Sequence, residues 1–211
     1  VLFRSVAAAV ASFFVQLGPA AKPGLYEHIR EGEKHIKAGR YEKGLFCLHK
    51  AYEEAPESVA IGERLAEGYL EYARHLKSEG QLELAIEKAA TAYEMTPLSL
   101  PVINDLSYYL SVRAAERAFQ GDFQSAGEDL EIVSILADGS GFVRTNAANY
   151  LFNRAINARD IKNTEALMFC LEASYNLRPS FETIVFLGMS FYEEGDLDQA
   201  ALYWKEALAI K

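Results

Sequence analysis

The stretch that decides the fold is residues 184–207, which read IVFLGMSFYEEGDLDQAALYWKEA. Apolar residues recur at helical spacing on both sides of Gly195, so the pattern predicts two helices joined by a short turn. Glycine adopts a positive φ without steric cost, which lets Gly195 end the first helix and reverse the chain. The stretch therefore predicts an antiparallel helix pair.

The same pattern recurs along the chain from Gly24 onward. Three earlier turns also contain glycine (Gly39, Gly80 and Gly121), and a further copy has the glycine-free turn Asp160-Ile-Lys-Asn163. Five residues after the glycine of each turn comes a small residue: Gly44, Ala85, Ala126 and Ala200. Ala166 fills the same role in the copy without the glycine. Only Gly or Ala leaves room for a facing helix where two antiparallel helices cross closely. The sequence therefore predicts five helix pairs.

The last copy carries the fullest motif: Ile184, Leu187, Gly188, Phe191, Gly195, Leu197, Ala200, Trp204 and Ala207. In this pattern the chain resembles the tetratricopeptide repeat (TPR) family, whose 34-residue unit is a helix pair. The resemblance covers nearly everything from residue 24 to residue 211. It implies an all-α fold, a right-handed α-solenoid of antiparallel helix pairs, with residues 24–211 as one TPR-like helical repeat domain.

The spacing of the copies departs from the family unit. The step from Ala166 to Ala200 is 34 residues, but the three earlier steps are 41, 41 and 40 residues. An excess of about seven residues equals about two helical turns. We therefore expect elongated first helices at about 57–79, 98–120 and 141–159.

The charge balance argues against one class of partner. The 211 residues include 21 Lys and Arg against 30 Asp and Glu, a formal net charge of −9. Phosphate-mediated binding needs a basic stripe that this balance does not supply, so we expect no nucleic-acid partner. The two cysteines, Cys47 and Cys170, are too few for a disulfide framework or a four-cysteine metal site.

Residues 1–23 form a separate N-terminal apolar segment. The first five, VLFRS, resemble a translated sequencing adapter and are excluded from the fold prediction. Residues 6–17 form an apolar run that is shorter than the roughly 20 residues of a transmembrane helix. Two interpretations stay open: a cap helix packed on the first repeat, or a truncated membrane anchor or export signal. The localisation, cytoplasmic or membrane-tethered and exported, stays open with them.

No residue pattern in the sequence points to catalysis. His28 and His35 lie seven residues apart, whereas helical zinc motifs place two histidines four residues apart. Cys170 occupies a core position of its repeat, which favours a small buried hydrophobe over a nucleophile. The Gly-rich residues 138–141 lack the strand and lysine of a phosphate-binding loop. We therefore expect a non-enzymatic protein with no metal and no cofactor.

The resemblance implies that the first helices of the pairs line a concave groove that binds a partner. The family pattern places these residues there: Glu33, Glu67, Leu70, Arg74, Tyr108, Asn149, Phe152, Ile156 and Arg159. The expected function is a protein–protein interaction scaffold that binds a peptide or protein segment in this groove. The alternative is a membrane-tethered cell-envelope assembly or secretion accessory protein.

The last predicted helix carries more apolar residues than its partner helix can cover. Leu202, Tyr203, Trp204, Leu208 and Ile210 surround it, and pairing buries only one side of such a set. We expect an exposed apolar patch of a few hundred Å², a size that marks interaction sites. Two explanations stay open: the natural protein continues past Lys211, or two copies form a homodimer through the C-terminal end.

Overall fold

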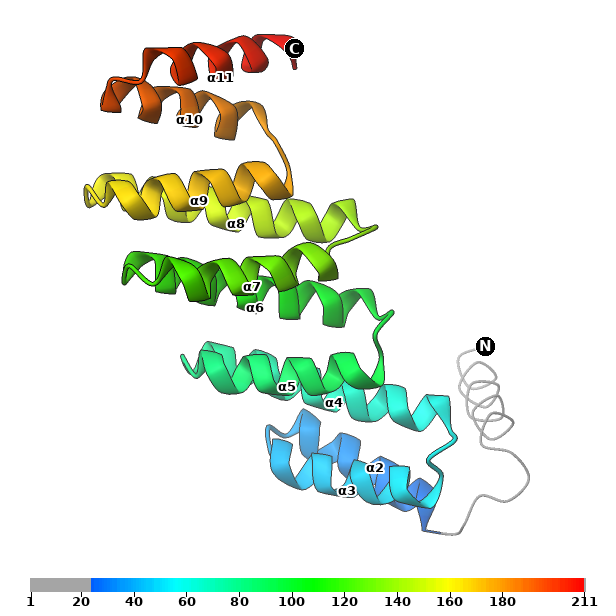
Figure 1. Cartoon of the computed structure of the whole chain (residues 1–211). Coiled ribbons are helices and arrows are strands. Elements are labelled where there is room, and N and C mark those ends of the chain that lie inside the picture. Colours follow the sequence, from blue (N-terminus) through cyan, green and yellow to red (C-terminus); the bar gives the residue numbers. More distant parts are fainter. Residues whose placement is uncertain (1–23, 211) are drawn as a thin grey trace, which may run out of the picture. The chain divides into compact units, whose positions relative to one another are not determined.

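The computed structural model describes residues 24–210, so the anchor and cap-helix interpretations of residues 1–23 fall outside the described residues. Within residues 24–210 the regular elements are all α-helices, and no strand occurs. The helices follow one another as pairs (Figure 1): α2 (Leu25–Lys37) and α3 (Tyr41–Glu54), α4 (Val59–Ser78) and α5 (Leu82–Met95), α6 (Leu100–Phe119) and α7 (Phe123–Leu136), α8 (Gly141–Asp160) and α9 (Thr164–Leu177), and α10 (Phe181–Glu194) and α11 (Leu197–Ala209). This order confirms the predicted all-α fold of TPR-like helix pairs.

The first helices of the middle pairs are elongated, as the spacing of the copies predicts. Helices α4, α6 and α8 have 20 residues each, whereas α2 has 13 and α10 has 14. The second helices keep a length of 13 or 14 residues. The additional residues of each long repeat therefore extend its first helix.

Each turn within a pair contains one residue in the left-handed region. Gly39, Gly80, Gly121 and Gly195 have φ values between 71° and 86°. In the glycine-free turn, Lys162 takes this conformation with φ 59°. The same backbone hydrogen bonds close these turns: Asp122 N donates to Arg117 O (2.9 Å), and Asn163 N donates to Ala158 O (2.9 Å). The copies are thus equivalent in backbone geometry even where the glycine is missing.

The small residues lie at the helix crossings, as expected. Gly44, Ala85, Ala126, Ala166 and Ala200 are all buried. A Cβ built on Gly44 would lie 2.7 Å from Ile36 Cδ1, and one built on Gly32 would lie 2.7 Å from Leu48 Cγ. Because real Cβ atoms do not approach so closely, α2 and α3 can cross at this distance only with glycine at both positions.

The described chain divides into two compact units, residues 24–102 and 103–210, with the boundary inside α6. In the first unit α4 packs against α2, α3 and α5. The core between α3 and α4 is built on Leu45, Leu48 and Leu65. A second cluster joins Leu70 of α4 to Ala92 of α5 and Val102 at the start of α6. These contacts fix the orientation of α4 within the unit.

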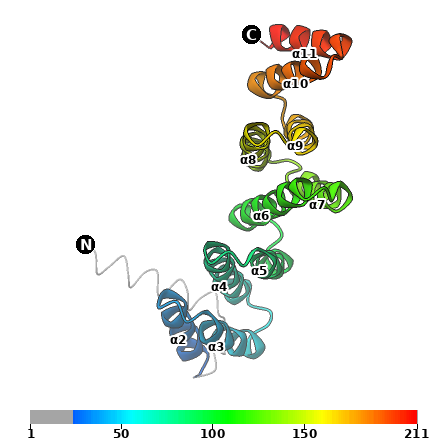
Figure 2. The same ribbon diagram turned by 90° about the vertical axis from the view of Figure 1, so that its left-hand side faces the viewer.

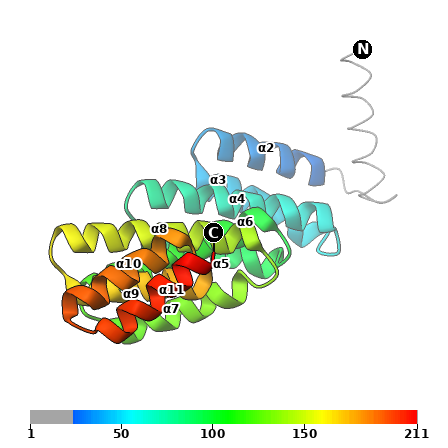
Figure 3. The same ribbon diagram turned by 90° about the horizontal axis from the view of Figure 1, so that it is seen from above.

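The second unit stacks its pairs in chain order. Figure 2 shows α6 and α8 on one side of this unit and α7 and α9 on the other. The last pair follows through α10, which packs against α9, and Figure 3 shows α10 and α11 running at an angle to α8. Aromatic contacts join successive first helices: Tyr108 meets Tyr150 (ring centroids 5.3 Å apart), and Phe152 meets Phe186 (5.4 Å). The unit therefore has a continuous core along its pairs.

Candidate functional site

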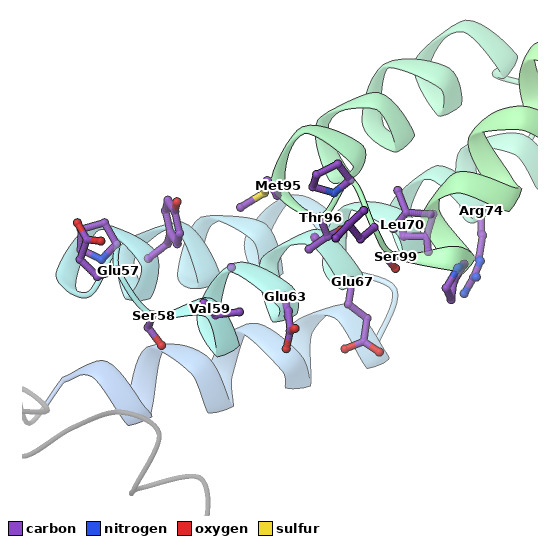
Figure 4. Close-up of a pocket in the computed structure, with 18 residues that line it drawn as sticks. Glu57, Ser58, Val59, Glu63, Glu67, Leu70, Arg74, Met95, Thr96 and Ser99 are labelled. Atoms are coloured by element: carbon purple, nitrogen blue, oxygen red, sulfur yellow. The ribbon is translucent and has the colours of Figure 1, made fainter. Parts of the chain in front are cut away.

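A groove of about 980 Å³ lies on α4 in the first unit (Figure 4). We call it the α4 groove. One wall is α4, which contributes Val59, Glu63, Glu67, Leu70 and Arg74. The other wall is the end of α5, with Met95, and the connection from α5 to α6, with Thr96, Pro97, Leu98 and Ser99. The α3–α4 connection, with Glu57, closes one end.

The α4 wall follows from the helical repeat. Its residues are separated by four, four, three and four positions, so they lie on one face of the helix. Leu70 is buried in the cluster with Ala92 and forms part of the floor, while Figure 4 shows the side chains of Glu63 and Glu67 projecting to the same side of α4. On the opposite face Ile61 and Leu65 are fully buried. The core thus holds α4 with this stripe facing the groove.

The second wall is a turn that proline helps to define. Helix α5 ends at Met95, and Pro97 cannot continue it. Thr96 Oγ1 donates to the carbonyl oxygen of Ala92 (2.9 Å), and Ser99 N donates to Thr96 O (3.0 Å). This turn holds the side chain of Leu98 in solvent, where it is 93% exposed.

The α4 groove carries negative charge. Glu57, Glu63 and Glu67 line it, and none of the three forms an ion pair with another residue of the described chain. Arg74 lines the far end, where its Nη1 lies 2.6 Å from Glu71 Oε1, so its charge is already compensated. The groove therefore combines acidic side chains with exposed apolar surface.

Glu33 lies outside this groove. Its carboxylate forms an ion pair with the guanidinium of Arg64, which is on α4. Both side chains are half-buried. This contact joins α2 to α4. Glu33 therefore holds two helices together instead of lining the α4 groove with Glu67, Leu70 and Arg74.

In the second unit, Asn149 and Phe152 line a smaller groove of about 450 Å³ between α8, the end of α9 and the start of α10. The groove also contains Ser174 and Thr183, whose hydroxyl groups are buried and already paired. Ser174 Oγ donates to the carbonyl oxygen of Ala148 (2.9 Å). Phe152 makes an edge-to-face contact with Phe186, so part of its ring is already in contact within the unit.

The remaining predicted groove residues line neither groove. Arg159 Nη2 lies 3.5 Å from Glu193 Oε1, and its guanidinium lies 5.5 Å from the centroid of Phe186. Ile156 is half-buried. Tyr108 packs edge-on against Tyr150, and burial raises the pKa of Tyr150 to about 12. The structure thus brings together Glu67, Leu70 and Arg74, and separately Asn149 and Phe152.

The other residues singled out by sequence have packing partners. Cys170 is fully buried, and burial raises the pKa of its thiol to about 12, as suits a core residue. His49 Nε2 lies 2.6 Å from the Tyr69 hydroxyl, and His28 Nδ1 lies 3.1 Å from Glu54 Oε1. Residues 24–210 contain no group of three or more His, Cys, Asp or Glu side chains placed to hold a metal ion. In the same part of the chain, no helix has the length and apolar character needed to cross a membrane.

Comparison with known proteins gives similarity in fold alone. No family model matches the sequence, and no curated protein matches it. Among solved structures, a thermophilic TPR protein from Thermus thermophilus is 19% identical over 88% of this chain and 90% of that chain, with a TM-score of 0.35. MamA from Desulfovibrio magneticus RS-1 is 12% identical over 90% and 96%, with a TM-score of 0.38. BtubC from P. vanneervenii is 12% identical over 90% and 91%, with a TM-score of 0.39.

The fold is TPR-like. Its helices follow one another as antiparallel pairs, its turns contain one left-handed residue each, and small residues lie buried at the crossings. The α4 groove lies on the first helix of the second helix pair.

Sequence reasoning missed part of the α4 groove. Glu63 and Val59 continue the stripe backward from Glu67 at four-residue steps, so helical periodicity alone would have found them. Leu98 and its neighbours gave no comparable signal. They reach the groove because the α5–α6 connection folds back beside α4, which a sequence pattern does not specify.

Exposed apolar residues predicted for the last helix are present on α11 and at Ile210 directly after it. Leu202, Leu208 and Ile210 are all exposed, and Trp204 is exposed in part. This exposure confirms that α10 covers only one side of α11. The homodimer through this end of the chain stays a prediction.

Proposed function

We propose that this TPR-like chain is a non-enzymatic protein-interaction scaffold and that its α4 groove receives a peptide or protein segment. One observation carries the proposal: an open groove of about 980 Å³ is bordered by exposed apolar side chains. Val59 is 75% exposed on one wall and Leu98 is 93% exposed on the other. Apolar side chains that gather around a concavity are typical of binding sites.

The fixed walls of the groove support this function. Helix α4 is held by fully buried side chains on its opposite face, and the α5–α6 turn is held by hydrogen bonds of Thr96. A ligand that enters preformed walls loses less free energy to the ordering of its receptor. The groove therefore suits a short segment that can bury only a small surface area on binding.

Selection of peptides from a random library against the full chain tests the proposal. Peptides of about ten residues are long enough, because an extended residue spans about 3.3 Å and the α4 stripe is about 22 Å long. We expect selected peptides to lose binding to a Val59→Asp/Leu98→Asp variant. They should keep binding to Ile135→Asp/Ile161→Asp, which changes two exposed apolar residues outside both grooves.

Two results would contradict the proposal. Peptides that bind both variants equally well would assign binding to another surface. A library from which the full chain enriches no peptide would argue against segment binding as the function.

A further inference from the structure

We infer that the α4 groove selects an extended segment with the pattern apolar-x-basic-x-basic, where x is a small polar residue. The inference rests on the proposed function, because it specifies which segment the same groove receives. Three features of the groove lead to it: its charge, the spacing of its glutamates and its volume.

The charge of the groove determines the sign of the ligand. Glu63 and Glu67 point to the same side of α4, and neither has an ion-pair partner among residues 24–210. Arg74 lies seven residues beyond Glu67, about 10 Å along the helix axis, and is paired with Glu71. A ligand with Lys or Arg opposite the two glutamates would gain charge complementarity, whereas an acidic ligand would be repelled.

The spacing of the glutamates determines the spacing of the basic residues. Four helical residues rise about 6 Å, which is the axial distance from Glu63 to Glu67. Two residues of an extended chain rise about 6.6 Å, and side chains two apart point to the same face. Alternate residues of an extended ligand therefore match the two carboxylates.

The apolar position follows from the same arithmetic. Val59 lies four residues before Glu63, so it is again about 6 Å away along the helix axis. Its side chain is largely exposed at the groove. An apolar residue two positions from the first basic residue would cover Val59, and the intervening residues would face away from α4.

The volume of the groove favours an extended segment over a helix. The α4 stripe from Val59 to Arg74 is about 22 Å long. A helix of about 10 Å diameter and that length occupies about 1,700 Å³. The groove provides about 980 Å³, so a helix would leave much of its side-chain surface outside, whereas a single extended strand would be accommodated.

Fluorescence anisotropy with labelled peptides and the full chain tests the inference. The probe GLSKSKSG carries the proposed pattern, GLSKKSSG has the same composition with adjacent lysines, and GLSESESG reverses the charges. We expect GLSKSKSG to bind several-fold more tightly than GLSKKSSG, and GLSESESG not to bind. Raising the ionic strength from about 0.05 M to about 0.3 M should weaken binding of GLSKSKSG, because both partners are solvent-exposed charges.

Matched variants locate the charges. Glu63→Gln/Glu67→Gln should weaken binding of GLSKSKSG about tenfold, the scale of two exposed ion pairs. Glu128→Gln/Glu131→Gln makes the same charge change at two exposed glutamates of α7 that line neither groove, and it should leave binding unchanged. Equal effects of the two double variants would overturn the inference, since only the overall charge would then matter.

The remaining outcomes separate the inference from the proposed function. Tighter binding of a peptide with lysines four residues apart would overturn the extended conformation in favour of a helix. If library peptides bind in a manner sensitive to Val59→Asp/Leu98→Asp but carry no basic residues, the inference fails and the proposed function stands. If neither these probes nor any library peptide binds, both fail.

Discussion

Gly188 of α10 faces the indole ring of Trp204 on α11, and the two helices approach at this point because Gly188 has no side chain. A Cβ built on Gly188 would lie about 2.5 Å from Trp204 Cδ1. Carbon atoms pack at about 3.5–4.0 Å, so an alanine here would force the indole ring or a helix to move. The crossing of the last pair therefore depends on this glycine.

We expect Gly188→Ala to lower the free energy of unfolding by about 1–3 kcal/mol, the usual effect of overpacking a core. The sign of this change in the free energy of unfolding is informative, because a Gly to Ala substitution inside a helix otherwise stabilises a protein by about 0.5–1 kcal/mol. Gly127→Ala on α7 is the matched control, since a Cβ there would meet no atom within 4 Å. Urea unfolding measures both, and a stabilised Gly188→Ala variant would contradict the crossing.

A second prediction concerns the buried carboxylate of Asp129. This side chain is 2% exposed, with Oδ1 2.7 Å from Arg113 Nη2 and Oδ2 2.8 Å from Arg117 Nη1. Asp129→Asn would remove the negative charge that faces two partly buried guanidinium groups. We expect it to lower the free energy of unfolding by about 3 kcal/mol.

Asp138→Asn is the control for this change. The Asp138 carboxylate is 82% exposed beside Arg144, so its ion pair should contribute less than about 1 kcal/mol. Urea unfolding of the two variants compares a buried and an exposed pair of the same residue types. Similar losses in both would show that burial does not determine the energy of the Asp129 cluster.

The helix pairs were predictable because local chemistry determines them. Gly80 and Gly121 take the positive φ that their turns need, and Ala85 and Ala126 lie buried at the crossings that need small residues. These are properties of single residues and fixed spacings, which a sequence displays directly.

The burial of Asp129 and the second wall of the α4 groove could not be predicted in this way. A carboxylate does not fit the hydrophobic pattern of the repeats. Asp129 is buried only because two arginines of α6 form ion pairs with it. Leu98 lines the groove only because the α5–α6 connection folds back beside α4. Both features depend on contacts between segments rather than on local sequence.

The glycine-free turn gives a third prediction. Lys162 has φ 59° in a turn closed by the same hydrogen bonds as the turn at Gly121. A non-glycine residue in the left-handed region costs about 1–2 kcal/mol. We expect Lys162→Gly to raise the free energy of unfolding by up to about 1 kcal/mol, because part of the relief is offset by the greater freedom of glycine in the unfolded chain.

The reciprocal change tests the same principle. Gly121→Lys should lower the free energy of unfolding by about 1 kcal/mol, since it introduces the strain that Lys162→Gly removes. No neighbouring atom lies within 4 Å of a Cβ at Gly121, so the effect reports backbone conformation rather than a clash. Shifts of the same sign in both variants would contradict the equivalence of the two turns.

The last prediction concerns the pH dependence of the α7 N-cap. The side chain of Asp122 accepts a hydrogen bond from Ser125 N (3.1 Å), and hydrogen bonding from Ser125 lowers the pKa of this carboxyl below its ordinary value. A group whose pKa is lower in the folded state stabilises the fold above its unfolded pKa, about 3.9, and loses that contribution as the pH falls through the folded value. Asp122→Ala should therefore lower the melting temperature at pH 6, and the difference in melting temperature from the unchanged chain should shrink toward pH 2.

The control is Ser140→Ala, which removes the N-cap of α8, where a hydroxyl accepts a hydrogen bond from Val143 N. Its difference in melting temperature should not vary with pH, because the hydroxyl does not titrate. A difference for Asp122→Ala that stays constant down to pH 2 would show that the ionised carboxylate is not what caps α7.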